Sequence, residues 1–425
     1  MEKLKGNAVI GQSGGPTCVI NRSLVAAVEE LKKSPLVTAI FGARHGVDGI
    51  LKEEFIDLRK QSKTTLARLV ETPGAALGST RKRPKAGDED CIRIFEVFRK
   101  YDVRYFFYIG GGDSAQTANT ISALARSKGY EFRTFHIPKT IDNDLIGSDH
   151  TPGYATAARF VACAFMGDDL DNRSLSGVKV NVVMGRHAGY LTAASVLGKL
   201  NEESGPHLVY CPERLFDMDR FIADVDEVHA RLGRCVVAVS EGIATGTDDK
   251  DLIVTQAGET MLKESVRMEM PRDPSGHPQL SGTGILADYL VWRVRRVLES
   301  KYEAQKKKFR IRGDTFGYLQ RSFPGVLSAV DAREAAQVGK LAARFALTSG
   351  ADGSVVIKRK PGPRYAVEIS CVPLSEVARG ESTMPDHFIN QAGNYVTQAF
   401  VDYARPLVGR LPEAGLIQKS LVPKR

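Results

Sequence analysis

The chain has 425 residues, a hydrophobic fraction of 43%, a charged fraction of 26% and a formal net charge of +9. This length predicts two or three domains, and the composition is ordinary for a soluble globular protein. The basic residues form no long stripe with interleaved aromatics, which argues against a nucleic-acid-binding protein. No apolar run approaches the roughly 18–20 residues of a membrane helix, which argues against a membrane protein.

The first part of the chain alternates predicted strands and helices. Runs rich in β-branched and aromatic residues predict the strands, and helically spaced apolar residues predict the helices. In chain order we expect a strand at 7–11, a helix at 19–31, a strand at 35–41, a glycine-punctuated loop at 44–49, a helix at 88–101, a strand at 105–109, a helix at 114–127, a strand at 132–137 and a helix at 153–166. This alternation is typical of a parallel sheet covered by helices on both faces.

A second alternating block follows the first. Its expected elements are a strand at 178–184, a helix ending near residue 200, a strand at 207–211, a helix at 217–231, a strand at 234–240, a helix at 285–303 and a strand at 310–315. Residues 244–284 are polar and rich in glycine and proline, which indicates an excursion or lid. After the block we expect a helix at 329–347, a small hairpin of strands 354–358 and 365–369, and a helix at 384–403.

These elements predict an α/β fold with two Rossmann-like parallel-sheet domains facing each other across a cleft. We expect an N-terminal domain at 1–150, a second domain at 151–330 that includes the excursion, and C-terminal helices and a hairpin at 331–425 that complete the fold. Ligands of such sheets bind at the carboxyl ends of the strands, where the glycine turns of this chain fall.

The cysteines and histidines suggest neither disulfides nor a zinc site. The six cysteines are scattered and form no C-x-x-C pair, which favours reduced thiols in a cytoplasmic protein. His45, His136 and His150 lack the spacing of metal ligands. The first six residues lead directly into a predicted strand, so we expect no secretory signal.

The chain is organised around the stretch 105–114. An uncharged strand there ends in three glycines, which are followed by Asp113, Ser114 and a predicted helix. Glycines at a helix N-terminus let a phosphate approach the backbone N–H groups closely. A similar glycine turn, which includes Gly14, follows the first strand. We therefore expect an anion site at this edge of the sheet.

A second stretch, 137–144, carries reactive side chains just after the next strand. It places Lys139, Thr140, Asp142 and Asp144 within six residues. Phosphoryl transfer needs a cation for the phosphates, a carboxylate for Mg²⁺, and a carboxylate to take the proton of the attacking hydroxyl. Arg81 follows a glycine-serine turn and suits a phosphate-facing loop.

Seven motifs together resemble the phosphofructokinases, and within them the pyrophosphate-dependent kind. They run in the family order from residue 7 to about residue 325, and PKTIDND at 138–144 is the most specific. The motifs are Ser13-Gly14-Gly15, Leu77-Gly78-Ser79-Thr80-Arg81, Gly110-Gly111-Gly112-Asp113-Ser114, Pro138-Lys139-Thr140-Ile141-Asp142-Asn143-Asp144, Met184-Gly185-Arg186, Glu241-Gly242 and Gly317-Tyr318-Leu319-Gln320-Arg321. The last hundred residues contain no such motif.

The resemblance implies reversible phosphoryl transfer from pyrophosphate to the 1-hydroxyl of fructose 6-phosphate, giving fructose 1,6-bisphosphate and phosphate. It implies that Asp142 is the general base and that Thr140 hydrogen-bonds the sugar or the transferred phosphoryl group. Arg186 would stabilise charge on that group, and Asp144 would orient the site or reach the metal through water. As an alternative, Asp142 could merely cap a helix.

The sugar would bind residues of the second block. The resemblance implies that Met184 and Gly185 shape its pocket, Glu241 accepts hydrogen bonds from its hydroxyls, and Tyr318 and Arg321 hold the 6-phosphate. The alternatives are a packing role for Met184, a surface position for Glu241 and a structural ion pair for Arg321.

Two residues of the donor site differ from the ATP-using relatives. Those relatives have glycine where this chain has Asp113 and Lys139. Asp113 would occupy the space of an α-phosphate and repel its charge, whereas Lys139 would pair with pyrophosphate. Gly14, Arg81 and Gly112 would complete the donor site. Because relatives often carry a metal-binding aspartate at the position of Gly112, we expect Asp113 to hold Mg²⁺ instead.

The resemblance also implies a homodimer or homotetramer. Many relatives have an arginine near residue 178 that reaches the neighbouring subunit, and Lys179 is the residue here that could replace it. Two alternative functions remain open at this point: an ATP-dependent phosphofructokinase, and a catalytically silent subunit that binds sugar phosphate. The presence of Asp142 and Lys139 argues against a silent subunit.

Overall fold

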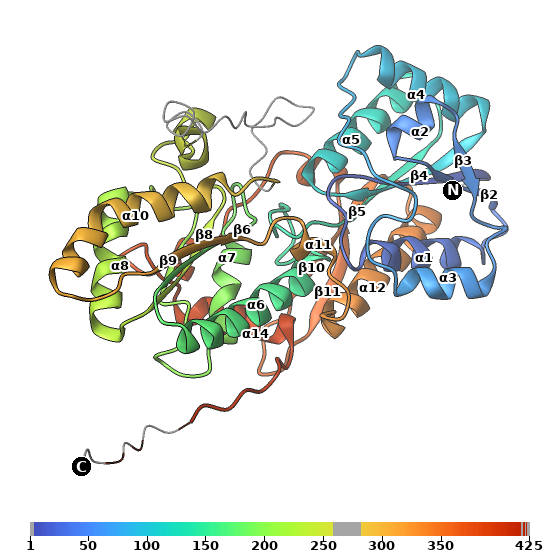
Figure 1. Ribbon diagram of the computed structural model, residues 1–425. Coiled ribbons are helices and arrows are strands. Elements are labelled where there is room, and N and C mark those ends of the chain that lie inside the picture. The colour runs from blue at the N-terminus through green and yellow to red at the C-terminus, as the bar shows by residue number, and fades with distance from the viewer. Residues whose placement is uncertain (1–3, 258–281, 418–419, 421, 423–425) are drawn as a thin grey trace.

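A seven-stranded sheet forms the first half of the molecule. We describe it from a computed structural model that covers residues 4–257, 282–417, 420 and 422 (Figure 1). The strand order is β11-β10-β5-β4-β1-β2-β3, and β11 and β3 are antiparallel edges on an otherwise parallel sheet. The strands are β1 (Gly6–Gln12), β2 (Val37–Ala43), β3 (Phe55–Asp57), β4 (Val103–Gly110), β5 (Arg133–Pro138), β10 (Gly353–Arg359) and β11 (Val367–Val372).

A four-stranded parallel sheet forms the second half. Its order is β7-β8-β6-β9, with β6 (Val178–Val183), β7 (Leu208–Tyr210), β8 (Cys235–Ser240) and β9 (Ile311–Thr315). Strands β6 and β8 are buried along their whole length, as expected for β-branched runs that are covered on both faces. The predicted fold class, α/β with two mostly parallel sheets, is confirmed.

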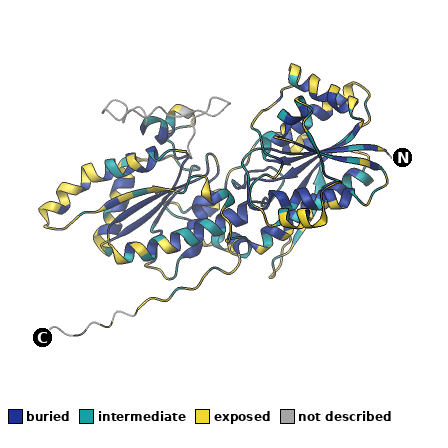
Figure 2. Ribbon diagram, turned by 45° about the vertical axis from the view of Figure 1, so that its right-hand side comes forward, coloured by how far each residue is buried: buried dark blue, intermediate teal, exposed yellow. Residues whose placement is uncertain are grey.

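Helices cover both sheets and present exposed faces to solvent (Figure 2). They are α1 (Ile20–Leu31), α2 (Val47–Leu51), α3 (Lys63–Val70), α4 (Glu89–Lys100), α5 (Gly112–Ser127), α6 (Tyr154–Ser174), α7 (Tyr190–Ala194), α8 (Met218–Leu232), α10 (Ile285–Ala304), α11 (Leu319–Ser322), α12 (Ala329–Thr348), α13 (Leu374–Val377) and α14 (Gln398–Val408). None of the described helices is long and apolar enough to cross a membrane.

The C-terminal part of the chain returns to the first sheet. Helix α12 lies beside α1 (Figure 1), where the Ser23 hydroxyl donates to the Ala335 carbonyl at 2.8 Å. Gly339 allows this close approach, because a Cβ there would overlap the Ser23 backbone. The predicted small hairpin is present as β10–β11, and it extends the sheet from β5. The domain boundary near residue 150 remains a prediction.

Several local predictions were wrong. Residues 384–403 do not form one helix: a 3₁₀ turn at Asp386–Phe388 and a bridge between Ile389 and Val396 precede α14. The predicted loop at 44–49 contains the start of α2. Instead of one helix that ends near residue 200, the short helix α7 is followed by a 3₁₀ turn at Ser195–Gly198. The elements β3 and α3 were missed. Much of the predicted excursion, 258–281, lies outside the described residues.

Candidate active site

The carboxyl ends of three neighbouring strands, β1, β4 and β5, open onto one cavity of about 180 Å³. The loops that follow these strands line it, together with the loop around residue 81. Parallel strands bring their carboxyl-end loops together in this way, which is why the glycine turns of distant motifs meet. Eight site residues predicted from the sequence line the cavity: Gly14, Arg81, Gly112, Asp113, Lys139, Thr140, Asp142 and Asp144.

Lys139 is a buried cation with a fixed position. Its Nζ donates to the Gly15 carbonyl at 2.6 Å. Gly14 has a φ of +73°, and a Cβ there would lie 3.2 Å from this Nζ, so glycine suits both the turn and the close approach. Burial, with Arg321 adding to the effect, lowers the pKa of Lys139 to about 7. An anion bound here would restore the charged form.

The loop that carries Asp142 is held by its own side chains. The backbone N–H of Asp142 donates to Thr140 Oγ1 at 3.1 Å. Asn143 has a φ of +62°, a conformation that asparagine tolerates. Its amide donates to the Tyr403 hydroxyl at 2.7 Å and accepts from the Thr151 N–H at 2.9 Å. These contacts fix the direction in which the two flanking aspartates point.

The carboxyl groups of this loop have raised pKa values. Burial raises the pKa of Asp142, and the neighbouring Glu381 adds to the rise. Burial also raises the pKa of Asp144 well above its usual value, with the charge of Asp142 as the next cause. A carboxylate with a raised pKa is a stronger proton acceptor than an exposed one, provided that it is ionised at the working pH.

Asp113 lies in the first turn of α5, where Gly111 precedes the helix. Its carboxylate forms an ion pair with Arg83, whose side chain is 48% exposed. The early N–H groups of α5 form the positive end of the helix and favour an anion. The cavity therefore offers a phosphate three kinds of attraction: a helix N-terminus, the buried Lys139 and an arginine loop.

A second group of predicted residues gathers at the carboxyl ends of β6 and β8. Glu241 is buried, and its Oε1 accepts from the Gly185 N–H at 3.3 Å. The Met184 N–H donates to Gln320 Oε1, also at 3.3 Å. A Cβ on Gly242 would overlap the Arg186 carbonyl, so the two turns pack tightly together. The structure thus brings together the residues predicted to bind the sugar.

Arg321 connects the two groups. Its guanidinium carbon lies 4.4 Å from the centre of the Tyr318 ring, and its Nη1 lies 2.8 Å from the point where Gly15 would carry a Cβ. Its Nε is buried without a hydrogen-bond partner among the described residues. Burial, with Arg81 adding to the effect, lowers the pKa of Arg321. Arg321 therefore lies close to the donor turn. A residue that binds only the remote 6-phosphate of the sugar would not need to lie there.

Lys179, the predicted inter-subunit residue, is occupied within its own chain. Its ammonium group contacts the carboxylates of Asp168 and Asp171, and its side chain is 11% exposed. These two ion pairs give Lys179 a structural role within its own chain. A contact to a neighbouring subunit remains a prediction.

One residue of the cavity was missed by sequence reasoning. Glu381 lines the cavity beside Gly112, although it belongs to the C-terminal part that contains no recognisable motif. No local pattern around residue 381 indicates a site, because the chain path alone brings it there. The pairing of Arg83 with Asp113 was not expected either.

The donor set of the cavity fits a Mg²⁺ ion that is shared with a phosphate ligand. No group of three or more acidic, histidine or cysteine side chains within the described residues forms a ready metal cage. Mg²⁺ is usually held by one or two carboxylates together with substrate phosphates and water. The carboxylates that line the cavity are Asp113, Asp142, Asp144 and Glu381.

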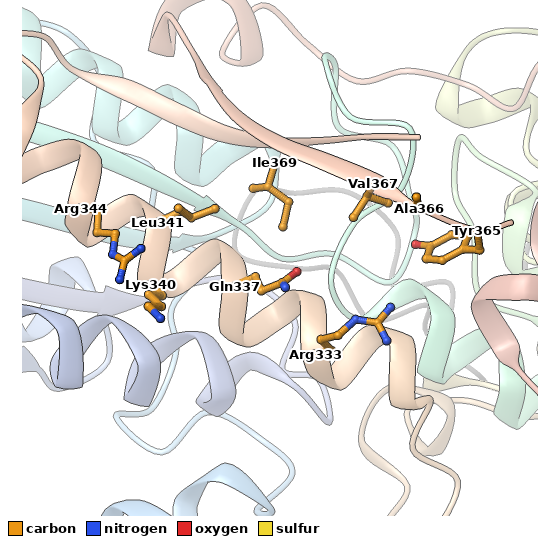
Figure 3. A pocket seen from close by; sticks show the side chains of 9 residues that line it. All are labelled: Arg333, Gln337, Lys340, Leu341, Arg344, Tyr365, Ala366, Val367 and Ile369. Carbon is orange, nitrogen blue, oxygen red and sulfur yellow. The ribbon is translucent and has the colours of Figure 1, made fainter. Parts of the chain in front are cut away.

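A larger groove of about 590 Å³ lies elsewhere, between α12 and β11 (Figure 3). Its charged side chains are Arg333, Lys340 and Arg344, and no carboxylate lines it. The groove therefore lacks a proton acceptor for phosphoryl transfer. We place the candidate active site at the smaller cavity, where carboxylates and cations meet.

Known proteins resemble this chain along most of its length. The family model described as Phosphofructokinase matches residues 7–346. The pyrophosphate--fructose 6-phosphate 1-phosphotransferase of Rhodospirillum rubrum is 49% identical over 99% of this chain and 98% of its own length. The enzyme of the same name from Xanthomonas campestris is 36% identical over 96% of this chain and 93% of its own. The crystal structure of the pyrophosphate-dependent phosphofructokinase from Marinobacter aquaeolei aligns with a TM-score of 0.79 at 32% identity, covering 99% of this chain and 98% of that one.

Proposed function

This chain belongs to the phosphofructokinase family, and we propose that it transfers a phosphoryl group from pyrophosphate to the 1-hydroxyl of fructose 6-phosphate. The products are fructose 1,6-bisphosphate and phosphate. The observation that carries the proposal is the meeting of Asp113 and Lys139 in one cavity of about 180 Å³. This volume is below the roughly 300–1,000 Å³ of pockets for drug-sized ligands, and it suits a small anion of high charge.

Asp142 is the general base in this proposal. Its carboxylate takes the proton of the 1-hydroxyl while that oxygen bonds to the transferred phosphorus and the phosphoanhydride bond breaks. Thr140 positions the attacking hydroxyl or the phosphoryl group, and its place in the lining of the same cavity as Asp142 supports this role. Lys139, Arg81 and the N-terminus of α5 stabilise the charge that develops on the donor.

Mg²⁺ supplies charge neutralisation across the phosphates when it is bound. Asp113 lies in the first turn of α5 and lines the donor cavity, which supports its role as a residue that holds the ion. Its pairing with Arg83 leaves carboxylate oxygen lone pairs for a metal.

The sugar phosphate binds between the two groups of residues. Met184 and Gly185 form its pocket, Glu241 accepts hydrogen bonds from its hydroxyls, and Tyr318 and Arg321 hold its 6-phosphate. Support comes from the 3.3 Å contact between Glu241 and Gly185 and from the stacking of Arg321 on Tyr318. Arg186 approaches the transferred group from the turn that packs on Gly242.

Two finer statements belong to the same proposal. The enzyme assembles from two or four copies, and Lys179 is the residue to examine at their contact. It acts in the cytoplasm, which agrees with six cysteines that form no disulfide within the described residues.

ATP is not the favoured donor, because Asp113 occupies space and carries charge where a nucleotide would need its α-phosphate.

The reverse reaction tests the proposal. Purified protein with Mg²⁺, fructose 1,6-bisphosphate and phosphate should form pyrophosphate, which ³¹P NMR detects directly. The forward reaction exchanges only one phosphoanhydride bond for a sugar phosphate ester, so the proposed reaction is reversible. The proposal therefore requires this signal. Protein that forms ATP from ADP and fructose 1,6-bisphosphate but no pyrophosphate from phosphate would refute it.

A further inference from the structure

The C-terminal part of the chain delivers a carboxylate to the donor cavity. Residue Glu381 forms an antiparallel bridge with Leu145, and the Ser382 N–H donates to the Asp144 carbonyl at 2.7 Å. These two contacts tie the segment after α13 to the loop that carries Asp142. The position of Glu381 is therefore fixed by backbone bonds to the candidate catalytic loop itself.

Glu381 lies beside Gly112 of the donor turn. A Cβ on Gly112 would lie 3.6 Å from Glu381 Cγ and 3.9 Å from Glu381 Oε1. Both distances are ordinary van der Waals contacts, so the glutamate side chain fills the space next to a residue without a side chain. Glu381 is exposed, and its carboxylate forms no ion pair or hydrogen bond within the described part of the chain.

An unpaired carboxylate at this position is unfavourable for a pyrophosphate site unless a cation accompanies the ligand. Neighbouring negative charges repel each other, and solvent weakens this repulsion only in part. A bound divalent cation inverts this balance, because carboxylate oxygens then become ligands. Asp113 alone already shares its carboxylate with Arg83, which leaves room for a second acidic ligand.

We propose that Glu381, together with Asp113, holds the Mg²⁺ that accompanies pyrophosphate, so that the C-terminal segment completes the donor site. This inference rests on the proposed function. Glu381 lies beyond residue 346, where the match to the family model ends. The role therefore belongs to the additional C-terminal part of this chain, and the family motifs do not assign it.

Metal binding can be measured without turnover. Mn²⁺ replaces Mg²⁺, methylenediphosphonate replaces pyrophosphate, and the free Mn²⁺ signal in electron paramagnetic resonance gives the dissociation constant of the ion. We expect Glu381→Gln to raise this constant at least tenfold, since even outer partners of a metal site commonly contribute roughly 10–100-fold. Glu376→Gln is the matched control: it removes an exposed glutamate of α13 that does not line the cavity, and it should leave the constant within about twofold.

A double variant tests the geometry and guards against misfolding. Gly112 has a negative φ and an added Cβ meets no atom closer than 3.6 Å, so an aspartate can be accommodated there. Gly112→Asp combined with Glu381→Gln should recover most of the lost Mn²⁺ affinity, because a carboxylate returns to the same space. Thermal unfolding of each variant checks that the fold is intact.

Two results would overturn the inference. One is a Mn²⁺ constant in Glu381→Gln that equals that of the unmodified protein. The other is tighter binding of metal-free methylenediphosphonate to Glu381→Gln with unchanged Mn²⁺ affinity, which would make Glu381 a charge barrier. The pyrophosphate assay of the unmodified protein separates this question from the proposed function: an inactive protein whose Mn²⁺ binding depends on Glu381 would refute only the function.

Discussion

Replacing Asp113 tests how the cavity selects its donor. The carboxylate lies in the first turn of α5, in a cavity that also contains Lys139. A nucleotide would have to bring its α-phosphate past this carboxylate, whereas pyrophosphate ends before it. Asp113→Asn removes the charge and keeps the size, and Asp113→Gly removes both. The pair of variants therefore separates electrostatic repulsion from steric exclusion.

The structure sets the expected magnitude. Two like charges 4 Å apart repel by about 4 kcal/mol at an effective dielectric of 20. The Asp113 side chain is 38% exposed and is paired with Arg83, so solvent and the guanidinium offset a large part of this repulsion. We take about 1.4–2.8 kcal/mol as the remainder, which corresponds to a tenfold to hundredfold change in relative kcat/KM. The larger change should occur in Asp113→Gly, where space opens as well.

The assay measures kcat/KM for pyrophosphate and for ATP at saturating fructose 6-phosphate and Mg²⁺. Both variants should lose pyrophosphate activity, because Asp113 is also a proposed ligand of the metal, and the ratio of ATP to pyrophosphate use should rise. Lys85→Gln serves as the control, because it removes an exposed charge of the same loop that does not line the cavity. An unchanged donor ratio in both Asp113 variants would show that donor choice lies elsewhere in the site.

Three further predictions concern the chemistry of the same cavity. Asp142→Asn should lower kcat by roughly 10²–10⁴-fold with a much smaller change in the KM for fructose 6-phosphate, and a variant that keeps most of its kcat would remove Asp142 from the base role. Arg321→Ala should raise the KM for fructose 6-phosphate and also lower kcat, because its guanidinium reaches Gly15 at the donor turn; a change in KM alone would confine it to the 6-phosphate. Since the pKa of Lys139 is lowered to about 7, the lysine is charged below that pH and loses its proton above it, so the KM for pyrophosphate should rise as the pH increases through 7. Lys139→Arg should flatten this rise, because a guanidinium keeps its charge, and a pH-independent KM in the unmodified protein would contradict the assignment.

Local sequence patterns predicted much of the fold and most of the donor site. The run 105–109 within β4 is uncharged and β-branched or aromatic, and the glycines that follow it leave few other structures open. Because the parallel topology brings the ends of β1, β4 and β5 together, residues from separate motifs could be assigned to one cavity in advance. These predictions depended on neighbours in sequence, on a general rule of sheet architecture and on the resemblance of the motifs to those of the phosphofructokinases.

The C-terminal part could not be predicted in the same way. Apolar residues between 384 and 403 suggested one helix. Pro385 and Gly393, which has a φ of +74°, interrupt it. These two residues were therefore a better guide to the local structure than the apolar spacing. The position of Glu381 depends on backbone bonds to Leu145 and Asp144, which no periodicity reveals. Contacts between distant segments therefore supplied the part of the site that the sequence did not show.

The central claim is that pyrophosphate is the phosphoryl donor. The most direct measurement gives purified protein fructose 6-phosphate and Mg²⁺, supplies either pyrophosphate or ATP at the same concentration, and follows fructose 1,6-bisphosphate. We predict rapid formation of the bisphosphate with pyrophosphate and none above background with ATP. Equal or faster formation with ATP would contradict the claim.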